Sequence, residues 1–166
     1  MGRLMPHRHQ IYLDTNAAIL LIEGEGLLRD LMRDLASKAS SQPSTILCTS
    51  ALTISELLVK PLRDGDQKLV EVYRAWGSGL PWLQIIPVES LILDMAAQLR
   101  ARRNSLKLPD AIHVASAFAV AATHFLTDDH GISPPLENPA VQAGPYFEVC
   151  RLNELTLTSL IESLSA

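Results

Sequence analysis

Residues 108–131, LPDAIHVASAFAVAATHFLTDDHG, are predicted to form a helix, a strand and a pair of acids in succession. The Ala-rich part has Pro109 near its first turn, where proline is tolerated, and Asp110 beside it. The run HFLT that follows is typical of a buried strand. Asp128 and Asp129 stand side by side where this strand stops. Adjacent like charges cost stability unless a cation or hydrogen-bond donors compensate, although a helix cap or a solvated turn would also explain the pair.

The same alternation of strands and helices extends over the rest of the chain. Short β-type runs are predicted to be strands at 10–14, 45–49, 83–88, 124–127 and 146–152. Helical apolar spacing or helix-ending residues lie between and after them, at 15–26, 27–40, 50–60, 64–79, 89–103, 108–123 and from about 153 onward. Ser50 is the expected N-cap of its helix, and Pro61 is expected to end it. This order predicts one α/β domain with a mainly parallel five-stranded sheet.

Composition limits the class of protein. The chain has 166 residues, 48% hydrophobic and 19% charged, which fits one globular domain with a real core. The apolar run at 111–122 is too short to span a bilayer, and the basic N-terminus is followed by Asp14 rather than by an apolar stretch. We therefore expect a cytoplasmic protein, with residues 1–9 as a tail and 10–166 as the domain. Cys48 and Cys150 have no companion at metal-ligand spacing, so buried, reduced cysteines are expected.

Four acids are predicted to meet at one edge of the sheet. Asp14 ends the first strand, Asp129 follows the fourth, and Asp110 lies in the first turn of the preceding helix. Glu56 lies two turns into the helix after the second strand. In open α/β sheets, ligands bind beyond the carboxyl ends of the strands, so these acids share a crevice if strands one and four are neighbours. A carboxylate cluster suits Mg²⁺ or Mn²⁺, which predicts metal-dependent phosphodiester hydrolysis.

Each acid also has a purely structural explanation. Asp14 and Asp110 would suit a helix N-cap and the dipole of a first helical turn. Glu56 could pair with Lys60 on a helix surface, a contact worth about 0.3 kcal/mol. Only the agreement in position among the four acids favours a shared site.

The motifs LDTNAAI (13–19), ISEL (54–57), LPDAIHVASA (108–117) and FLTDDHG (125–131) resemble, in order, the four motifs of PIN-domain nucleases. The resemblance is particularly to the short VapC-type toxins of bacterial toxin–antitoxin pairs, and it runs over nearly the whole chain. It implies a five-stranded parallel sheet, Mg²⁺ or Mn²⁺ as cofactor, and endonucleolytic cleavage of RNA. It also implies a small antitoxin partner and a homodimer formed by the helices that follow strands one and two.

Carried over by position, the resemblance makes Asp14, Glu56, Asp110 and Asp129 the catalytic acids. Asp14, Asp110 and Asp129 are the expected metal ligands, with Asp128 as an alternative for the fourth motif. Glu56 is expected to ligate the metal through water or to position the attacking hydroxide. Asn16 and Thr127 match polar positions of the family that support the acids.

Two histidines and a basic run remain open. His113, one turn after Asp110, is more easily explained as a structural residue than as a metal ligand or base, and His130 could contact phosphate or lie in a solvated loop. Four basic residues precede Asp110 and are candidates to bind RNA phosphates or simply form a solvated helix end, namely Arg100, Arg102, Arg103 and Lys107. A net charge of −4 supplies no global attraction for RNA.

The resulting hypothesis is a metal-dependent endoribonuclease, the toxin of a toxin–antitoxin pair. One alternative is a PIN-like protein with a catalytically weak site that acts as an RNA- or protein-binding module. A phosphate-receiver or phosphatase-like domain would also place acids at strand ends. It is disfavoured because no lysine follows a late strand at the corresponding place.

Overall fold

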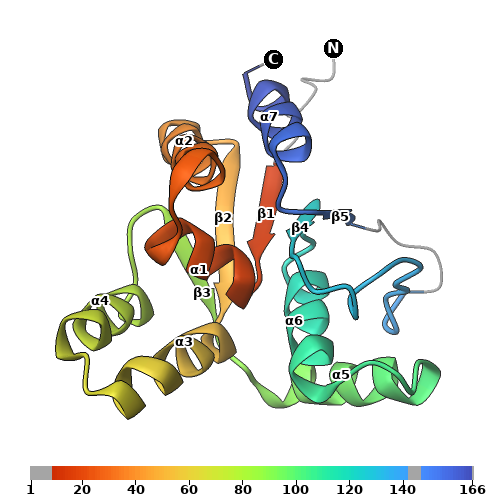
Figure 1. Cartoon of the computed structure of the whole chain (residues 1–166). Coiled ribbons are helices and arrows are strands. Elements are labelled where there is room, and N and C mark those ends of the chain that lie inside the picture. Colours follow the sequence, from red (N-terminus) through yellow and green to blue (C-terminus); the bar gives the residue numbers. More distant parts are fainter. Residues whose placement is uncertain (1–8, 142–146, 166) are drawn as a thin grey trace.

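Five parallel strands form one sheet in the computed structural model, which describes residues 9–141 and 147–165 (Figure 1). The strands lie in the order β3-β2-β1-β4-β5, and every neighbouring pair is parallel. They are β1 (His9–Leu13), β2 (Thr45–Ser50), β3 (Leu83–Ile86), β4 (His124–Leu126) and β5 (Glu148–Cys150). The predicted fold class is confirmed, and strands one and four are neighbours, as the expected convergence of the acids requires.

Helices cover both faces of the sheet (Figure 1). Helices α5 and α6 pack on one face, and the other helices pack on the opposite face. The helices are α1 (Thr15–Glu23), α2 (Gly26–Ser41), α3 (Ala51–Asp64), α4 (Gln67–Gly77), α5 (Ser90–Arg102), α6 (Leu108–Ala119) and α7 (Glu154–Ser163).

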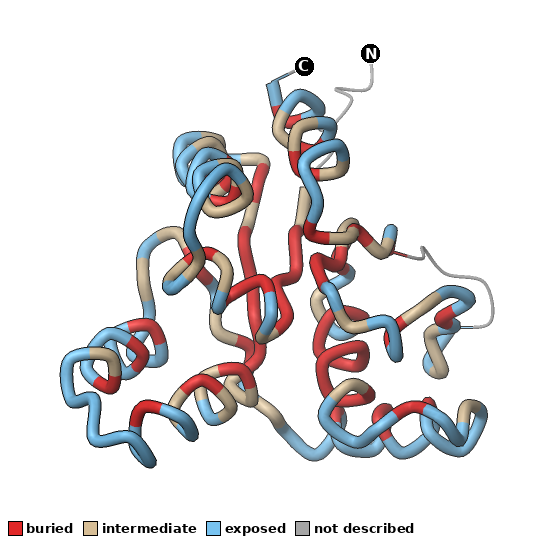
Figure 2. Tube along the Cα trace, viewed as in Figure 1, coloured by how far each residue is buried: buried red, intermediate tan, exposed pale blue. Residues whose placement is uncertain are grey.

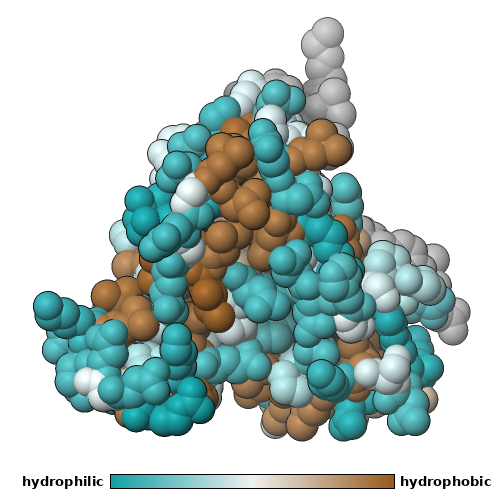
Figure 3. All heavy atoms as spheres, in the orientation of Figure 1, coloured by the Kyte–Doolittle hydropathy of each residue, from teal (hydrophilic) through white to brown (hydrophobic). Residues whose placement is uncertain are grey.

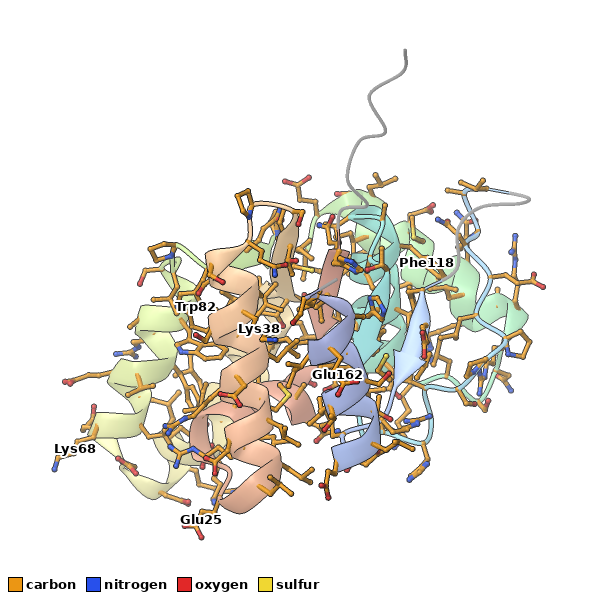
Figure 4. All side chains as sticks on the ribbon, turned by 90° about the horizontal axis from the view of Figure 1, so that it is seen from above. Glu25, Lys38, Lys68, Trp82, Phe118 and Glu162 are labelled. Atoms are coloured by element: carbon orange, nitrogen blue, oxygen red, sulfur yellow. The ribbon has the colours of Figure 1, made fainter. Side chains whose placement is uncertain are left out.

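Two hydrophobic clusters separated by the sheet form the core. Along β1, Ile11 and Leu13 belong to the cluster under α1, α2, α3 and α7, whereas Tyr12 belongs to the cluster under α5 and α6. This alternation follows from the two-residue period of a strand, and a strand buried on both faces becomes apolar throughout. Figure 2 shows the burial concentrated in the central strands and in α6. Seen from above in Figure 4, Trp82 and Phe118 lie on opposite sides of the sheet.

Most predicted elements agree with the structure, but the predicted end of α3 is wrong. The helix continues past Pro61 to Asp64, and Pro61 is buried. Proline in a helix loses the hydrogen bond of its own nitrogen and crowds the carbonyl four residues earlier, so a buried ring is retained here because packing offsets both costs. The helix ends at Gly65, whose φ of 74° is left-handed, with its N–H directed to the carbonyl of Pro61.

Other expectations at the sequence level also have clear outcomes. Both cysteines are free and buried, as predicted, and burial raises the pKa of each thiol to about 12. Ser50 caps α3, as predicted, and Asn153, the expected start of the last helix, caps α7. Tyr146, predicted to begin the fifth strand, lies outside the described residues. None of the described helices combines the length and apolar character needed to cross a membrane.

Candidate active site

The four predicted acids lie around the carboxyl ends of the central strands. Asp14 follows β1 directly, and Asp129 lies three residues after the end of β4. Glu56 comes from α3, which begins where β2 ends, and Asp110 lies in the first turn of α6. Figure 1 shows the beginnings of α1, α3 and α6 near this edge of the sheet. The parallel order of β2, β1 and β4 brings these distant segments together.

Asp14 is the most deeply buried of these acids. It is 3% exposed, and its Oδ1 accepts a hydrogen bond of 2.9 Å from the N–H of Ala17, so that it caps α1. Burial raises the pKa of Asp14 to about 6, although hydrogen bonds from Thr127 and Ala17 act in the opposite direction. The capping explanation is therefore correct, but the cap alone does not compensate the buried charge.

Asp110 and Asp129 approach the same space from two elements. A Cβ atom built on Gly131 would lie 3.0 Å from Asp129 Oδ1 and 3.6 Å from Asp110 Oδ2. Burial and the nearby charge of Asp129 both raise the pKa of Asp110, while Lys107 lowers it. Two carboxylates that repel each other in this way favour a bound cation between them.

Glu56 differs from the other acids because protein donors already compensate its charge. Its Oε2 atom lies 2.9 Å from His113 Nε2 and accepts a hydrogen bond from the hydroxyl of Thr15. Burial alone would raise the pKa of Glu56, but the hydrogen bonds with His113 and Thr15 lower it below the ordinary value. Its partner is His113 of α6 rather than Lys60 of its own helix.

His113 occupies the centre of this arrangement. It is 4% exposed, and its Nδ1 atom lies 2.8 Å from the hydroxyl of Tyr12. A charge on its ring would lower the pKa values of Asp14, Glu56 and Asp110, so all three lie within its electrostatic reach.

Sequence reasoning missed the two partners that hold His113 and Glu56. Tyr12 lies in β1 between the core residues Ile11 and Leu13, and Thr15 is the first residue of α1. The sequence indicated a role for Tyr12 and Thr15 only through their positions on either side of Asp14.

Thr127 connects two acids, whereas Asn16 does not use its side chain in the same way. Thr127 is fully buried, its side chain lowers the pKa of Asp14, and its Oγ1 accepts a 2.9 Å bond from the N–H of Asp129. The Asn16 side chain is exposed, and only its backbone lowers the pKa of Asp14. Two further candidates near the site, Asp128 and His130, are exposed.

Two arginines hold the loop that carries Asp129. Arg151 donates to the carbonyl oxygens of Asp129 and Ile132, each at 2.8 Å. Arg103 donates to the carbonyl and hydroxyl of Ser133 and, at 3.4 Å, to the carbonyl of Gly131. Arg151 was not among the predicted residues, because nothing near it in the sequence points to a loop 19 to 22 residues away.

The basic run therefore has several roles. The Arg103 guanidinium is engaged by the loop, and Arg100 donates from Nε to the carbonyl of Leu106 at 3.1 Å. Arg102 and Lys107 are exposed, and Lys107 lowers the pKa of Asp110. The structure thus brings one member of the run, Lys107, into the electrostatic reach of the acids.

The donors of the site fit a hard cation in their chemistry. They are carboxylate oxygens, and burial leaves two of them with raised pKa values. In the part of the chain that the structure describes, however, no group of three or more His, Cys, Asp or Glu side chains is arranged so that it could hold a metal ion. Asp110 and Asp129 converge as a pair, while the Asp14 carboxyl is directed to the cap of α1.

Comparison with known families identifies the class of protein. The family model for the PIN domain matches residues 11–133, a range that contains all four acids. The chain therefore belongs to the PIN domain family. A comparison with curated protein sequences gives no significant match.

Solved structures similar to this chain share its fold at low sequence identity. The crystal structure of VapBC2 from Rickettsia felis bound to a promoter DNA fragment matches with a TM-score of 0.62 and 12% identity, covering 86% of this chain and 98% of that chain. The sarcin–ricin loop cleaving toxin VapC20 from Mycobacterium tuberculosis matches with a TM-score of 0.56 and 15% identity, over 69% and 86% of the two chains. A toxin–antitoxin complex from Klebsiella pneumoniae matches with a TM-score of 0.52 and 24% identity, over 76% and 98%.

Proposed function

We propose that this protein is an endoribonuclease that hydrolyses RNA phosphodiester bonds with the help of Mg²⁺ or Mn²⁺. The observation that carries the proposal is the arrangement of acids after β1 and β4 and at the start of α6, where burial raises the pKa values of Asp14 and Asp110. A bound cation offsets the free-energy cost of ionising carboxylates that are buried and close together, so such acids favour cation binding. Membership of the PIN domain family supports the same chemistry.

The acids have two different roles in this proposal, metal binding and the positioning of water. Asp14, Asp110 and Asp129 would hold the metal ion, with Asp128 as the alternative ligand. When bound, the ion would supply Lewis-acid stabilisation of charge on the reacting phosphate and its oxygens. Glu56 stays ionised because His113 and Thr15 donate to Oε2, and its Oε1 can accept a hydrogen bond from an attacking water.

RNA binding would depend on a local positive charge, since the whole chain carries a net charge of −4. Arg100, Arg102 and Lys107 are exposed and would contact phosphates, with Lys107 nearest in its charge effect to the acids, whereas the Arg103 guanidinium is hydrogen-bonded to the loop. Aromatic residues make up 5% of the chain, which disfavours recognition by base stacking. Selectivity would therefore come from the shape of the RNA.

We also propose that the protein is the toxin of a toxin–antitoxin pair, acts in the cytoplasm, and forms a homodimer. Support comes from the similarity in fold to toxin–antitoxin complexes. The face drawn in Figure 3 shows apolar atoms gathered around α1 and α2. Exposed apolar side chains on α1 to α4 would contribute to such contacts, and they are Ile19, Leu27, Val59, Leu62 and Val72.

Cleavage of single-stranded RNA by the purified protein tests the enzymatic proposal. We expect cleavage with Mn²⁺ or Mg²⁺, none in the presence of a chelator, and a loss of at least about 100-fold in Asp14→Asn. The matched control is Asp34→Asn, which changes an exposed acid on α2 and should leave the rate unchanged. Equal rates in wild type and Asp14→Asn, or no cleavage with any divalent metal, would refute the proposal.

Two further measurements separate the alternatives. RNA binding or antitoxin binding without Mn²⁺ binding would support the binding-module alternative. Growth arrest on expression, relieved by Asp14→Ala and by a co-expressed antitoxin, is the result expected of a toxin.

A further inference from the structure

Tyr12, His113 and Thr15 form a chain of hydrogen bonds that ends on Glu56. The Tyr12 hydroxyl lies 2.8 Å from His113 Nδ1, and His113 Nε2 lies 2.9 Å from Glu56 Oε2. The Thr15 hydroxyl donates to the same Oε2 atom and lies 3.3 Å from His113 Nε2. Four segments of the chain, β1, α1, α3 and α6, contribute to this one array.

The direction of each hydrogen bond follows from the chemistry of the partners. An ionised carboxylate can only accept hydrogen bonds, so His113 Nε2 must carry a proton to bind Glu56. If the ring carries a single proton, the opposite nitrogen, Nδ1, accepts the proton of the Tyr12 hydroxyl. A tyrosine hydroxyl is a proton donor at neutral pH, because the pKa of a phenol is ordinarily about 10. In that tautomer His113 accepts from Tyr12 at Nδ1 and donates to Glu56 from Nε2, which matches both distances.

We propose that His113 is a positioning residue for Glu56, and that Tyr12 fixes the tautomer and orientation of its ring. This inference rests on the proposed nuclease function of the same site. Because both donors bind Oε2, the other oxygen, Oε1, is the one left to accept a hydrogen bond from the attacking water. His113 acts through Glu56 and touches neither metal nor RNA.

The geometry supports positioning rather than simple filling of the core. His113 is buried against Tyr12 and lies on the face of α6 that carries Asp110 one turn earlier. Glu56 is only half-buried, so water could satisfy its carboxylate without His113. A buried imidazole with both nitrogens bonded, one of them to a solvent-accessible acid, instead fixes the conformation of that acid.

The test compares kcat for RNA cleavage with Mn²⁺ affinity in matched variants. Removing an outer hydrogen-bond partner of this kind costs about 10- to 100-fold in activity, so His113→Leu should lower kcat by that factor while KM and the Mn²⁺ dissociation constant change less than about twofold. His113→Gln, which keeps an amide N–H donor near the Nε2 position, should recover most of the rate. In a Glu56→Gln background, His113→Leu should have no further effect, because both changes remove the same function.

Several results would overturn the proposal. These are an unchanged kcat in His113→Leu, an equal loss of Mn²⁺ affinity, additive effects with Glu56→Gln, or no recovery in His113→Gln. If His113→Leu does not fold, Tyr12→Phe replaces it, since it removes only the hydroxyl and should lower kcat with the same lack of additivity.

The tautomer of His113 can also be measured without RNA cleavage. NMR of the imidazole nitrogens at neutral pH should show a protonated Nε2 and an unprotonated Nδ1, and Tyr12→Phe should disturb this state. The opposite tautomer or a doubly protonated ring would contradict the proposal. A wild-type protein with the expected tautomer but no cleavage would instead refute the proposed function.

Discussion

At the scale of single residues, the buried carboxyl of Asp14 makes folding stability depend on pH. Its pKa of about 6 lies above the ordinary value, so the unfolded chain releases this proton at a lower pH than the folded protein does. The stability contributed by the protonated group is fully present below pH of about 4 and is lost as the pH rises to about 6. We expect Asp14→Asn to be more stable than the wild type at pH 7 without metal, by up to about 3 kcal/mol.

Denaturant unfolding of both proteins at pH 4 and pH 7 measures this effect. Asparagine keeps an oxygen for the N–H of Ala17, so the helix cap should survive the substitution. Asp34→Asn is the control, since its exposed side chain should give the same pH dependence as the wild type. An equal fall in stability between the two pH values in Asp14→Asn would show that Asp14 is not responsible.

The acid pair that ends β4 gives a second prediction at the residue scale. The carboxylates of Asp129 and Asp110 both lie close to Gly131, whereas Asp128 is exposed. We expect Asp129→Asn to weaken Mn²⁺ binding at least about 10-fold and Asp128→Asn to change it less than about twofold, because a site that loses a charged ligand binds a hard cation poorly. Titration calorimetry of the two variants decides, and a larger loss in Asp128→Asn would reverse the assignment.

Those acids of the site that lie next to the predicted end of a strand or start of a helix could be predicted from the sequence. Asp14 and Asp129 could be placed because an apolar run stops at each, and Asp110 because Pro109 marks the start of a helix. The hydrogen bonds of His113 were not predictable. Tyr12 has the apolar surroundings of any core residue, and its contact with His113 spans 101 residues of sequence.

At the scale of elements, the loop after β4 depends on an arginine beyond β5. Arg151 bonds the carbonyl oxygens of Asp129 and Ile132 with its two terminal nitrogens, a fork that one lysine cannot reproduce. Because hydrogen bonds to charged groups are worth about 1.5–3 kcal/mol, Arg151→Met should destabilise the fold by that order and also weaken Mn²⁺ binding through Asp129. Arg151→Lys should lie between the wild type and Arg151→Met.

Thermal unfolding and Mn²⁺ titration of these variants check the effect. Arg74→Met, which changes an exposed residue on α4, controls for the loss of a positive charge. Loss of stability without any change in Mn²⁺ affinity would mean that Arg151 supports the fold but does not position Asp129.

The order of the elements could be predicted because each buried strand is a short apolar run between helical patterns. Their precise ends could not, as α3 illustrates. The sequence places Pro61 where a helix often stops, yet the following turn remains helical because Pro61 is buried and Gly65 supplies the left-handed end. Tertiary packing, which the local pattern does not contain, decides such boundaries.

At the scale of the whole molecule, the acids join elements from both faces of the sheet. Glu56 comes from α3 on one face and Asp110 from α6 on the other, and Asp14 and Asp129 follow the two central strands. A cation bound by these acids would stabilise the folded chain because the unfolded chain has no such site. The gain at a free metal concentration of 100 times the dissociation constant is about 2.7 kcal/mol.

We therefore expect Mn²⁺ to raise the melting temperature of the wild type at pH 7 by about 5–10 °C at that concentration. The increase should be smaller at pH 5, because protons then compete for Asp14, whose pKa is about 6. Asp14→Asn and Asp129→Asn should lose most of the increase, and NaCl of equal ionic strength should not reproduce it. A shift of the same size in both variants would mean that Mn²⁺ binds elsewhere, and the acids at the carboxyl ends of β1 and β4 would then have to be explained by capping and solvation alone.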